Sequence, residues 1–198
     1  MSALRDPRVV ALLAVYLSRS VSTTLVPPCL PSLAEIYGVT YGGMGSLMAT
    51  FFAAYTLSVL LAATVGRVLS RRTLLIAGLA FQTVGTLGIA AAGSLGAARV
   101  AAVAYGLGGL ADLMATAILA DLGGRSSARL LTLAHGGFAL GAVTVPALAG
   151  IALDAAVGPR SLFLVAAAMN LGMLMWAWTV RDVEPAEGRA ATGTLRRL

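Results

Sequence analysis

The first long apolar stretch, residues 9–26, reads VVALLAVYLSRSVSTTLV and decides the class of the protein. A helix of about 20 residues crosses a hydrocarbon core, and this stretch approaches that length. An arginine lies inside the stretch, and no Ala-x-Ala cleavage site precedes Pro27 and Pro28. We therefore interpret residues 9–26 as a retained first membrane span and not as a removed signal peptide.

Five more apolar stretches of similar length follow along the chain. The six expected spans are residues 9–26, 44–65, 73–93, 98–120, 131–153 and 161–180. They predict an all-α integral membrane bundle over residues 1–180. The polar residues 181–198 are expected to form a cytoplasmic tail.

The composition excludes the main alternatives to a membrane protein. Among 198 residues, 59% are hydrophobic and 11% are charged, whereas a soluble domain carries about 25% charged residues. The single cysteine, Cys29, rules out a disulfide scaffold. The net charge of +6 comes from arginines that lie between apolar runs. A nucleic acid partner would require a basic face on a soluble core, so we expect none and expect the lipid bilayer instead.

The arginines also predict the orientation, because connections on the cytoplasmic side carry the excess of positive charge. Eleven of the fourteen arginines flank the spans on one side: Arg5, Arg8, Arg67, Arg71, Arg72, Arg125, Arg129, Arg181, Arg189, Arg196 and Arg197. Only Arg99 and Arg160 lie in the opposite connections, and Arg19 lies within the first span. We therefore expect a multi-pass protein of the cell (inner) membrane with both termini in the cytoplasm.

Two charged residues fall inside the expected spans. At helical rise, Arg19 lies about 15 Å and Asp112 about 12 Å from the cytoplasmic edge, so the two are nearly level. An uncompensated charge at the bilayer centre costs on the order of 3 kcal/mol. We therefore expect Arg19 and Asp112 to pair, or to share a water-filled site, near the midplane.

Polar residues at helical spacing accompany both charges, as expected for a substrate and proton-coupling site. They are Tyr16 and Thr23 on the first span, and Tyr105 and Thr116 on the fourth. A solute that competes for the arginine would free Asp112 to bind a proton; alternatively, Arg19 binds an anionic solute directly. A static pair that only fixes helix packing is the structural alternative.

The remaining polar residues leave two interpretations open. His135, the only histidine, serves as a gate or proton relay, or only hydrogen-bonds to a helix end. Gln82 and Asn170, the only side-chain amides, bind solute or join neighbouring helices. So few amides favour amphiphilic or small organic cargo over a sugar.

Catalysis is not expected. One histidine and one cysteine cannot form the usual metal-ligand sets. Phosphate-binding loops and nucleophile elbows are also missing from the sequence. We therefore expect a protein that is not an enzyme and that uses neither a metal nor a cofactor.

Small residues recur every few positions on the second and fifth spans, where they permit close approach of another helix. The second span carries one line of Gly45, Ala49 and Ala53, and another of Ala54, Ser58, Ala62 and Gly66. The fifth span carries Gly137, Gly141, Pro146 and Gly150. Two lines on one helix require two partners, so one line suggests contact with another subunit.

The connection between the second and third spans reads GRVLSRR over residues 66–72. It resembles the loop signature of the major facilitator superfamily, glycine-x3-aspartate-arginine-x-glycine-x-two basics. Arg67, Arg71 and Arg72 match the signature, whereas Gly66 replaces the aspartate. Residues 141–150 are similar to the glycine–proline signature of the family's fifth helix.

This resemblance implies the amino-terminal half of a transporter, with six helices in two inverted three-helix repeats. Such transporters usually contain two similar halves around a midplane cavity, which the first and fourth spans line. The function implied is secondary active transport of a small organic solute, proton-coupled, by alternating access in a homodimer of six-span halves. Alternatives are pairing with a separately encoded second half, a non-transporting regulatory or assembly subunit, and a truncated fragment.

Overall fold

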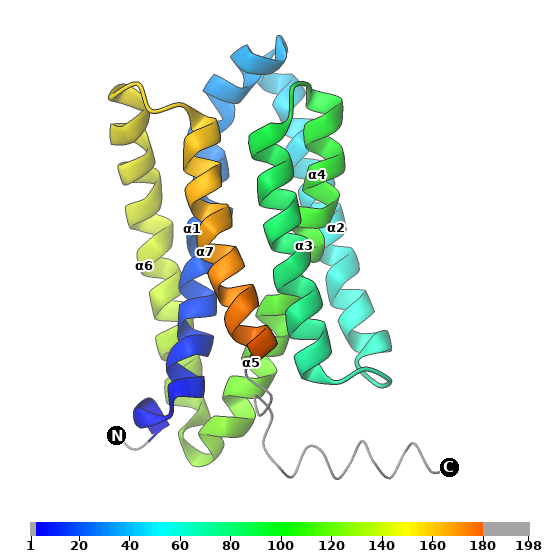
Figure 1. Ribbon diagram of the computed structural model, residues 1–198, viewed down its shortest axis with the longest axis vertical. Helices are drawn as coiled ribbons and strands as arrows, with labels where there is room; N and C mark the ends of the chain where they lie inside the picture. Colours follow the sequence, from blue (N-terminus) through cyan, green and yellow to red (C-terminus); the bar gives the residue numbers. More distant parts are fainter. Residues whose placement is uncertain (1–2, 180–198) are drawn as a thin grey trace.

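The computed structural model describes residues 3–179, and its regular secondary structure in that range is all helical (Figure 1). Its elements are η1 (Ala3–Arg5), α1 (Pro7–Tyr37), α2 (Tyr41–Val65), α3 (Arg71–Ala91), α4 (Leu95–Leu107), α5 (Gly109–Gly123), η2 (Gly124–Ser126), α6 (Ser127–Asp154) and α7 (Pro159–Thr179). The expected tail, residues 181–198 with Arg181, Arg189, Arg196 and Arg197, lies outside the described residues.

By length and hydropathy, five stretches of the described chain can cross a membrane. They are Pro7–Tyr37, Tyr41–Val65, Arg71–Ala91, Leu95–Asp154 and Pro159–Thr179. The fourth stretch, 60 residues long, contains α4, α5 and α6, and Figure 1 shows the chain reversing direction at η2. The all-α membrane class expected from the sequence is confirmed.

The first helix is longer than the expected span of residues 9–26, because it continues to Tyr37. Its three internal prolines are Pro27, Pro28 and Pro31. Each proline removes one backbone donor from the helix, yet the helix continues through all three positions. Gly38 then ends the helix in the left-handed conformation (φ 64°), in which its N–H bonds to the carbonyl groups of Ala34 and Glu35.

The expected span 98–120 is interrupted. α4 ends at Leu107 and α5 begins at Gly109, with Gly108 between them. The glycines here are required by close packing: a Cβ at Gly108 would lie 2.8 Å from Cβ of Gln82 on α3. A Cβ at Gly106 would collide with the backbone carbonyl of Phe51 on α2. α4 and α5 therefore lie tightly against α2 and α3, one turn before Asp112.

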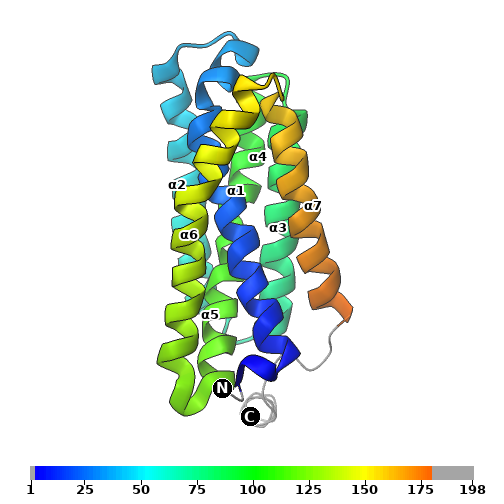
Figure 2. The same cartoon turned by 90° about the vertical axis from the view of Figure 1, so that its left-hand side faces the viewer.

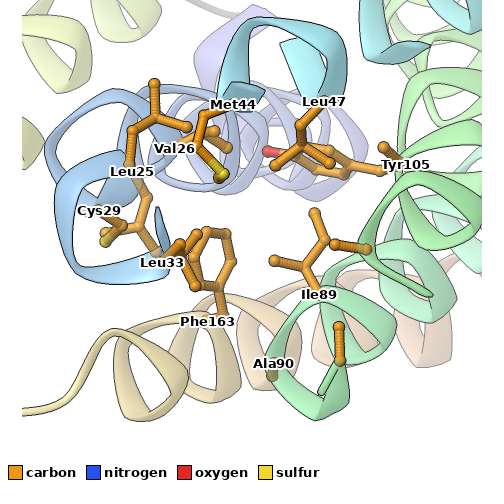
Figure 3. Close-up of a cluster of buried hydrophobic side chains, with 14 of the residues drawn as sticks. Leu25, Val26, Cys29, Leu33, Met44, Leu47, Ile89, Ala90, Tyr105 and Phe163 are labelled. Atoms are coloured by element: carbon orange, nitrogen blue, oxygen red, sulfur yellow. The ribbon is translucent and has the colours of Figure 1, made fainter. Parts of the chain in front are cut away.

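α1 occupies the middle of the bundle, where it contacts α2, α5, α6 and α7. Figure 2 shows α6 running along its outer side. Two apolar clusters fill the interior. One surrounds Leu33, Met44 and Phe163 (Figure 3), and the other surrounds Leu12 and Ile118. On α1, α2, α3 and α7 the buried polar residues lie in sequence between the members of these two clusters, so a polar layer separates two apolar cores.

Candidate functional site

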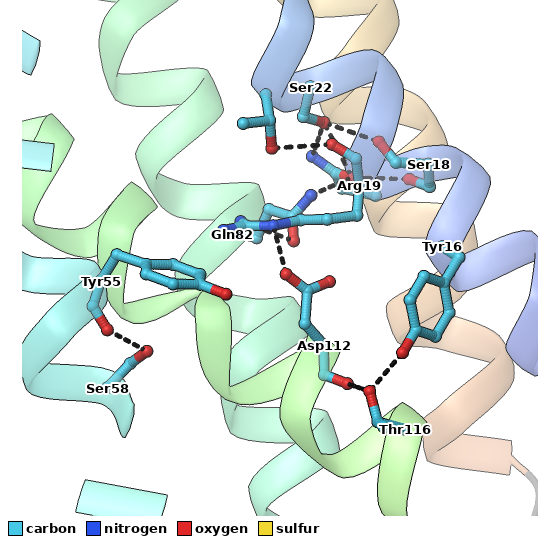
Figure 4. Close-up of polar contacts among 11 residues, drawn as sticks. Tyr16, Ser18, Arg19, Ser22, Tyr55, Ser58, Gln82, Asp112 and Thr116 are labelled. Carbon is cyan, nitrogen blue, oxygen red and sulfur yellow. Dashed lines mark hydrogen bonds and ion pairs between the residues drawn. The ribbon is translucent and has the colours of Figure 1, made fainter. Parts of the chain in front are cut away.

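The polar layer contains a buried ion pair between α1 and α5 (Figure 4). Arg19 Nε donates to Asp112 Oδ2 at 3.0 Å. The side chain of Arg19 is 2% exposed and that of Asp112 is 19% exposed. The two charges that the sequence places at one depth therefore meet in the structure.

The pair is tied to two further helices through the side-chain amides. Arg19 Nη1 donates to Gln82 Oε1 on α3 at 3.3 Å, and Gln82 Nε2 donates to Asn170 Oδ1 on α7 at 3.0 Å. Both amides are buried. Of the two sequence interpretations, the structure supports the one in which the amides join helices.

Asn170 is the centre of this hydrogen-bond network. Its Oδ1 accepts from the hydroxyl of Ser18 at 2.6 Å, and its Nδ2 donates to Ser22 at 3.0 Å and to Thr86 at 3.2 Å. All four side chains are buried. The network joins α1, α3 and α7 at the level of the ion pair, and the spacing of these residues in the sequence does not predict it.

Aromatic rings surround the charged group of Arg19. Its guanidinium carbon lies 5.6 Å from the ring centroid of Tyr55, 5.8 Å from that of Tyr105 and 6.0 Å from that of Phe51. Tyr105 was expected at the site, whereas Phe51 and Tyr55 on α2 were missed. Their four-residue spacing was a signal for one shared helix face.

Two polar atoms at the site remain unused. Asp112 Oδ1 and Tyr105 Oη are buried and have no hydrogen-bond partner among the described residues. The carboxylate thus binds Arg19 through one oxygen only. Among the described residues, no three histidine, cysteine, aspartate or glutamate side chains lie close enough to hold a metal ion.

Tyr16 and Thr116 extend the site toward the chain's N-terminal end. Their hydroxyl groups are hydrogen-bonded to each other, and Thr116 Oγ1 donates to the backbone carbonyl of Asp112 at 2.6 Å. The exposed His135 makes an edge contact with the Tyr16 ring, with centroids 5.5 Å apart. Thr23 donates to the carbonyl of Arg19 at 2.9 Å, so its hydroxyl is engaged with its own helix.

The arginines after α2 take different positions. Arg71 forms an ion pair with Asp121, and both side chains are more than 40% exposed. Arg72 Nη2 donates to the backbone carbonyl of Trp178 at 2.7 Å, whereas Arg67 is exposed. Exposed pairs of this kind contribute at most about 1 kcal/mol.

One small-residue line of α2 packs within the chain itself. Ala54 and Ser58 are buried, and a Cβ on Gly106 or Gly109 would collide with them. Farther along that line, Ala62 is partly buried and Gly66 is exposed. The other line of this helix, Gly45, Ala49 and Ala53, is exposed.

The small residues of α6 also differ in whether they contact another helix of this chain. Gly141 is buried against Ser20 of α1, whose side chain a Cβ would overlap. Gly137 and Gly150 have nothing within 4 Å of a Cβ position, and Pro146 is partly buried. Only Gly141 is therefore needed for close contact inside this chain.

Comparison with known proteins agrees with this architecture. The family model described as Major Facilitator Superfamily matches residues 11–197, nearly the whole chain. Comparison with curated proteins found no match. Proteins of the matched family are membrane transporters rather than enzymes. The chain, a multi-pass helical membrane protein with a buried ion pair, belongs to the Major Facilitator Superfamily.

Proposed function

We propose that this protein is a proton-coupled secondary transporter of a small organic solute. The observation that carries the proposal is the Arg19–Asp112 pair, buried between helices, with one carboxylate oxygen unpartnered. Ionisable groups inside a membrane are expensive and usually serve a function. Tyr16, Tyr105 and Thr116 form the surroundings of this pair in the proposed site, with Thr23 one turn farther along α1.

Coupling follows from competition within the pair. A solute that separates Arg19 from Asp112 without supplying a positive charge of its own deprives the carboxylate of its counter-charge. Binding a proton then restores neutrality at that depth, where an unpaired charge costs on the order of 3 kcal/mol. Solute binding and protonation of Asp112 are thereby linked, and alternating access carries both across the membrane.

We further propose six crossings arranged as two inverted three-helix repeats, with α4 and α5 forming the fourth crossing. The helix contacts support this symmetry. The contact between α1 and α6 corresponds to the contact between α4 and α2. The contact between α3 and α4 likewise corresponds to the contact between α7 and α1. Exchanging the first three crossings with the last three maps each of these contacts onto its counterpart, as inverted repeats require.

The distribution of arginines supports cytoplasmic termini in the cell (inner) membrane. In Figure 1 the N-terminus, the α2–α3 connection and η2 lie at one end of the bundle. Arg67 and Arg125 belong to those connections and Arg71 begins α3 beside them, whereas Arg99 and Arg160 lie near the starts of α4 and α7 at the other end. The positive end faces the cytoplasm under the positive-inside rule.

The complete transporter is proposed to be a homodimer of six-span halves. The exposed line of Gly45, Ala49 and Ala53 on α2 supports this assembly, because small residues permit close helix contact in lipid. Gly137 and Gly150 on α6, which have no atom within 4 Å of a Cβ position, support placing α6 at the same interface. Pairing with a separately encoded second half is the alternative. Either assembly completes a cavity between two halves.

Cross-linking tests the assembly. In a Cys29→Ser background, Ala53→Cys on α2 and Val143→Cys on α6 should form inter-subunit disulfides when the copies carrying them are co-expressed. Both positions are exposed. Val165→Cys on α7, also exposed, is the control outside the proposed interface and should give no cross-linked product. Absence of any α2–α6 product argues against a homodimer, and a product with another chain identifies a separate half.

Proton coupling is tested with reconstituted vesicles and a compound that a thermal-stability screen identifies as a ligand. Wild-type protein should accumulate this compound when a pH gradient is imposed. Asp112→Asn should abolish accumulation but retain counterflow exchange, because exchange needs no net proton transfer. Asp154→Asn, at an exposed aspartate, is the matched control. Full accumulation by Asp112→Asn refutes the role of Asp112.

A non-transporting regulatory or assembly subunit is the second candidate. The near-complete burial of Arg19 within the amide network favours it, because a sealed pair would only fix the helices. This candidate predicts that no compound is transported, while Arg19→Ala still lowers thermal stability.

A further inference from the structure

The surroundings of the Arg19 guanidinium are suited to a positive charge. Phe51, Tyr55 and Tyr105 place their ring centroids 5.6–6.0 Å from it, within the range over which ring faces attract cations. Asp112 supplies a full negative charge at 3.0 Å. We call these four side chains the aromatic cage.

The cage also offers polar atoms that Arg19 does not use. Asp112 Oδ1 and Tyr105 Oη are buried without a partner among residues 3–179. A buried polar atom left unsatisfied costs about 1–3 kcal/mol. A bound ligand that donates a hydrogen bond to Asp112 Oδ1 would remove part of that cost.

The charge of the missing ligand follows from these neighbours. An anion that approached Arg19 would meet the carboxylate of Asp112 and three electron-rich ring faces, all of which repel it. A cation that displaced Arg19 would gain all of these contacts. The side chain of Asp112 is 19% exposed and Tyr55 is partly exposed, so the cage is not completely sealed.

We propose that the aromatic cage recognises an amphiphilic organic cation, which takes the place of the Arg19 guanidinium. Arg19 is then a tethered cation on α1 that fills the cage while no ligand is bound. The inference rests on the proposed transport function and names the substrate class for that site. A cation of this kind neutralises Asp112 itself, so it competes with the proton for the carboxylate, and the two are exchanged instead of carried together.

The probes are tetraphenylphosphonium and, titrated separately, tetraphenylborate, an anion of nearly the same size and shape. Calorimetry with the full-length protein in detergent should detect binding of the cation but not of the anion. Tyr55→Leu should weaken cation binding about tenfold, the worth of one desolvated ring contact. Tyr55→Phe retains the ring and should retain the affinity. Phe81→Leu, at an exposed aromatic residue of α3, is the matched control and should bind like wild type.

Arg19→Ala removes the resident cation and should tighten tetraphenylphosphonium binding by about tenfold or more, since a competing internal group lowers the fraction of binding-competent molecules. Three results overturn the proposal. They are preferential binding of tetraphenylborate, equal cation affinity in Tyr55→Leu and wild type, and no cation binding by either wild type or Arg19→Ala. If Arg19→Ala does not fold, the comparison of Tyr55→Leu with Tyr55→Phe decides.

The transport proposal fails separately from this one. Cage-dependent cation binding without any transport in vesicles refutes the transport function and leaves the cage assignment standing. Proton-driven accumulation of an anion, lost in Asp112→Asn but unchanged in Tyr55→Leu, refutes the cage assignment and leaves the transport function standing.

Discussion

Replacing Arg19 by methionine tests how strongly the ion pair stabilises the bundle. Arg19 Nε lies 3.0 Å from Asp112 Oδ2, and only 2% of the arginine side chain is exposed. Removing one partner of a buried pair costs about 3–5 kcal/mol, and an uncompensated charge within a membrane costs about 3 kcal/mol. We therefore expect a loss of about 3 kcal/mol, or a melting temperature about 6–12 °C lower for a chain of this size.

The double variant Arg19→Met/Asp112→Leu removes both charges together. Because apolar replacements of a buried pair are often neutral, its melting temperature should recover to within a few degrees of wild type. Thermal unfolding of wild type, the two single variants and the double variant, in one detergent and at one protein concentration, completes this double-mutant cycle. Removing the exposed Arg71–Asp121 pair serves as the control and should change stability little. Additive losses in the Arg19/Asp112 double variant would refute the pairing.

Three further predictions concern the surrounding structure. Asn170→Leu should lower the free energy of unfolding by about 2 kcal/mol, since it breaks several buried bonds of about 0.6 kcal/mol each; an unchanged melting temperature would contradict the network. Gly106→Ala should destabilise far more than Gly137→Ala, because only at Gly106 does a Cβ meet another helix; equal melting temperatures would argue against that contact. Hydrogen bonds from Arg8 hold the pKa of Asp6 below its usual value. The stabilisation of the α1 start by Asp6 is therefore present above the pKa of the unfolded chain and lost as the pH falls through the lowered value, and an NMR titration in which Arg8→Ala left the Asp6 midpoint unchanged would refute this cause.

The sequence predicted the helices and the ion pair for one physical reason. Hydropathy sets the depth of each residue in the membrane. Two opposite charges at the same depth are expected to pair, because each is costly there without a partner. Arg19 and Asp112 could therefore be paired without knowledge of the helix rotations. The ends of the helices were harder to predict. Proline usually kinks or ends a helix, whereas α1 continues past three prolines, and the break at Gly108 depends on its contact with Gln82 of α3.

The rest of the site depends on helix rotation, which hydropathy does not define. Phe51 and Tyr55 are ordinary apolar residues of a membrane span in sequence, and only packing turns their rings toward Arg19. Gln82 and Asn170 were recognised as unusual, but either role was open until their mutual bond was seen. Similarly, the spacing of Ala54 and Ser58 does not say whether the partner helix belongs to the same chain.

Access to the aromatic cage from both sides of the membrane tests the transport account most directly. Tyr55→Cys in a Cys29→Ser background places a thiol beside the ion pair, and oriented vesicles are treated with a membrane-impermeant thiol reagent from either side. The account predicts labelling from each side in turn, with a ligand shifting the balance between them. A thiol that is labelled from neither side, or from one side only under all conditions, would contradict it.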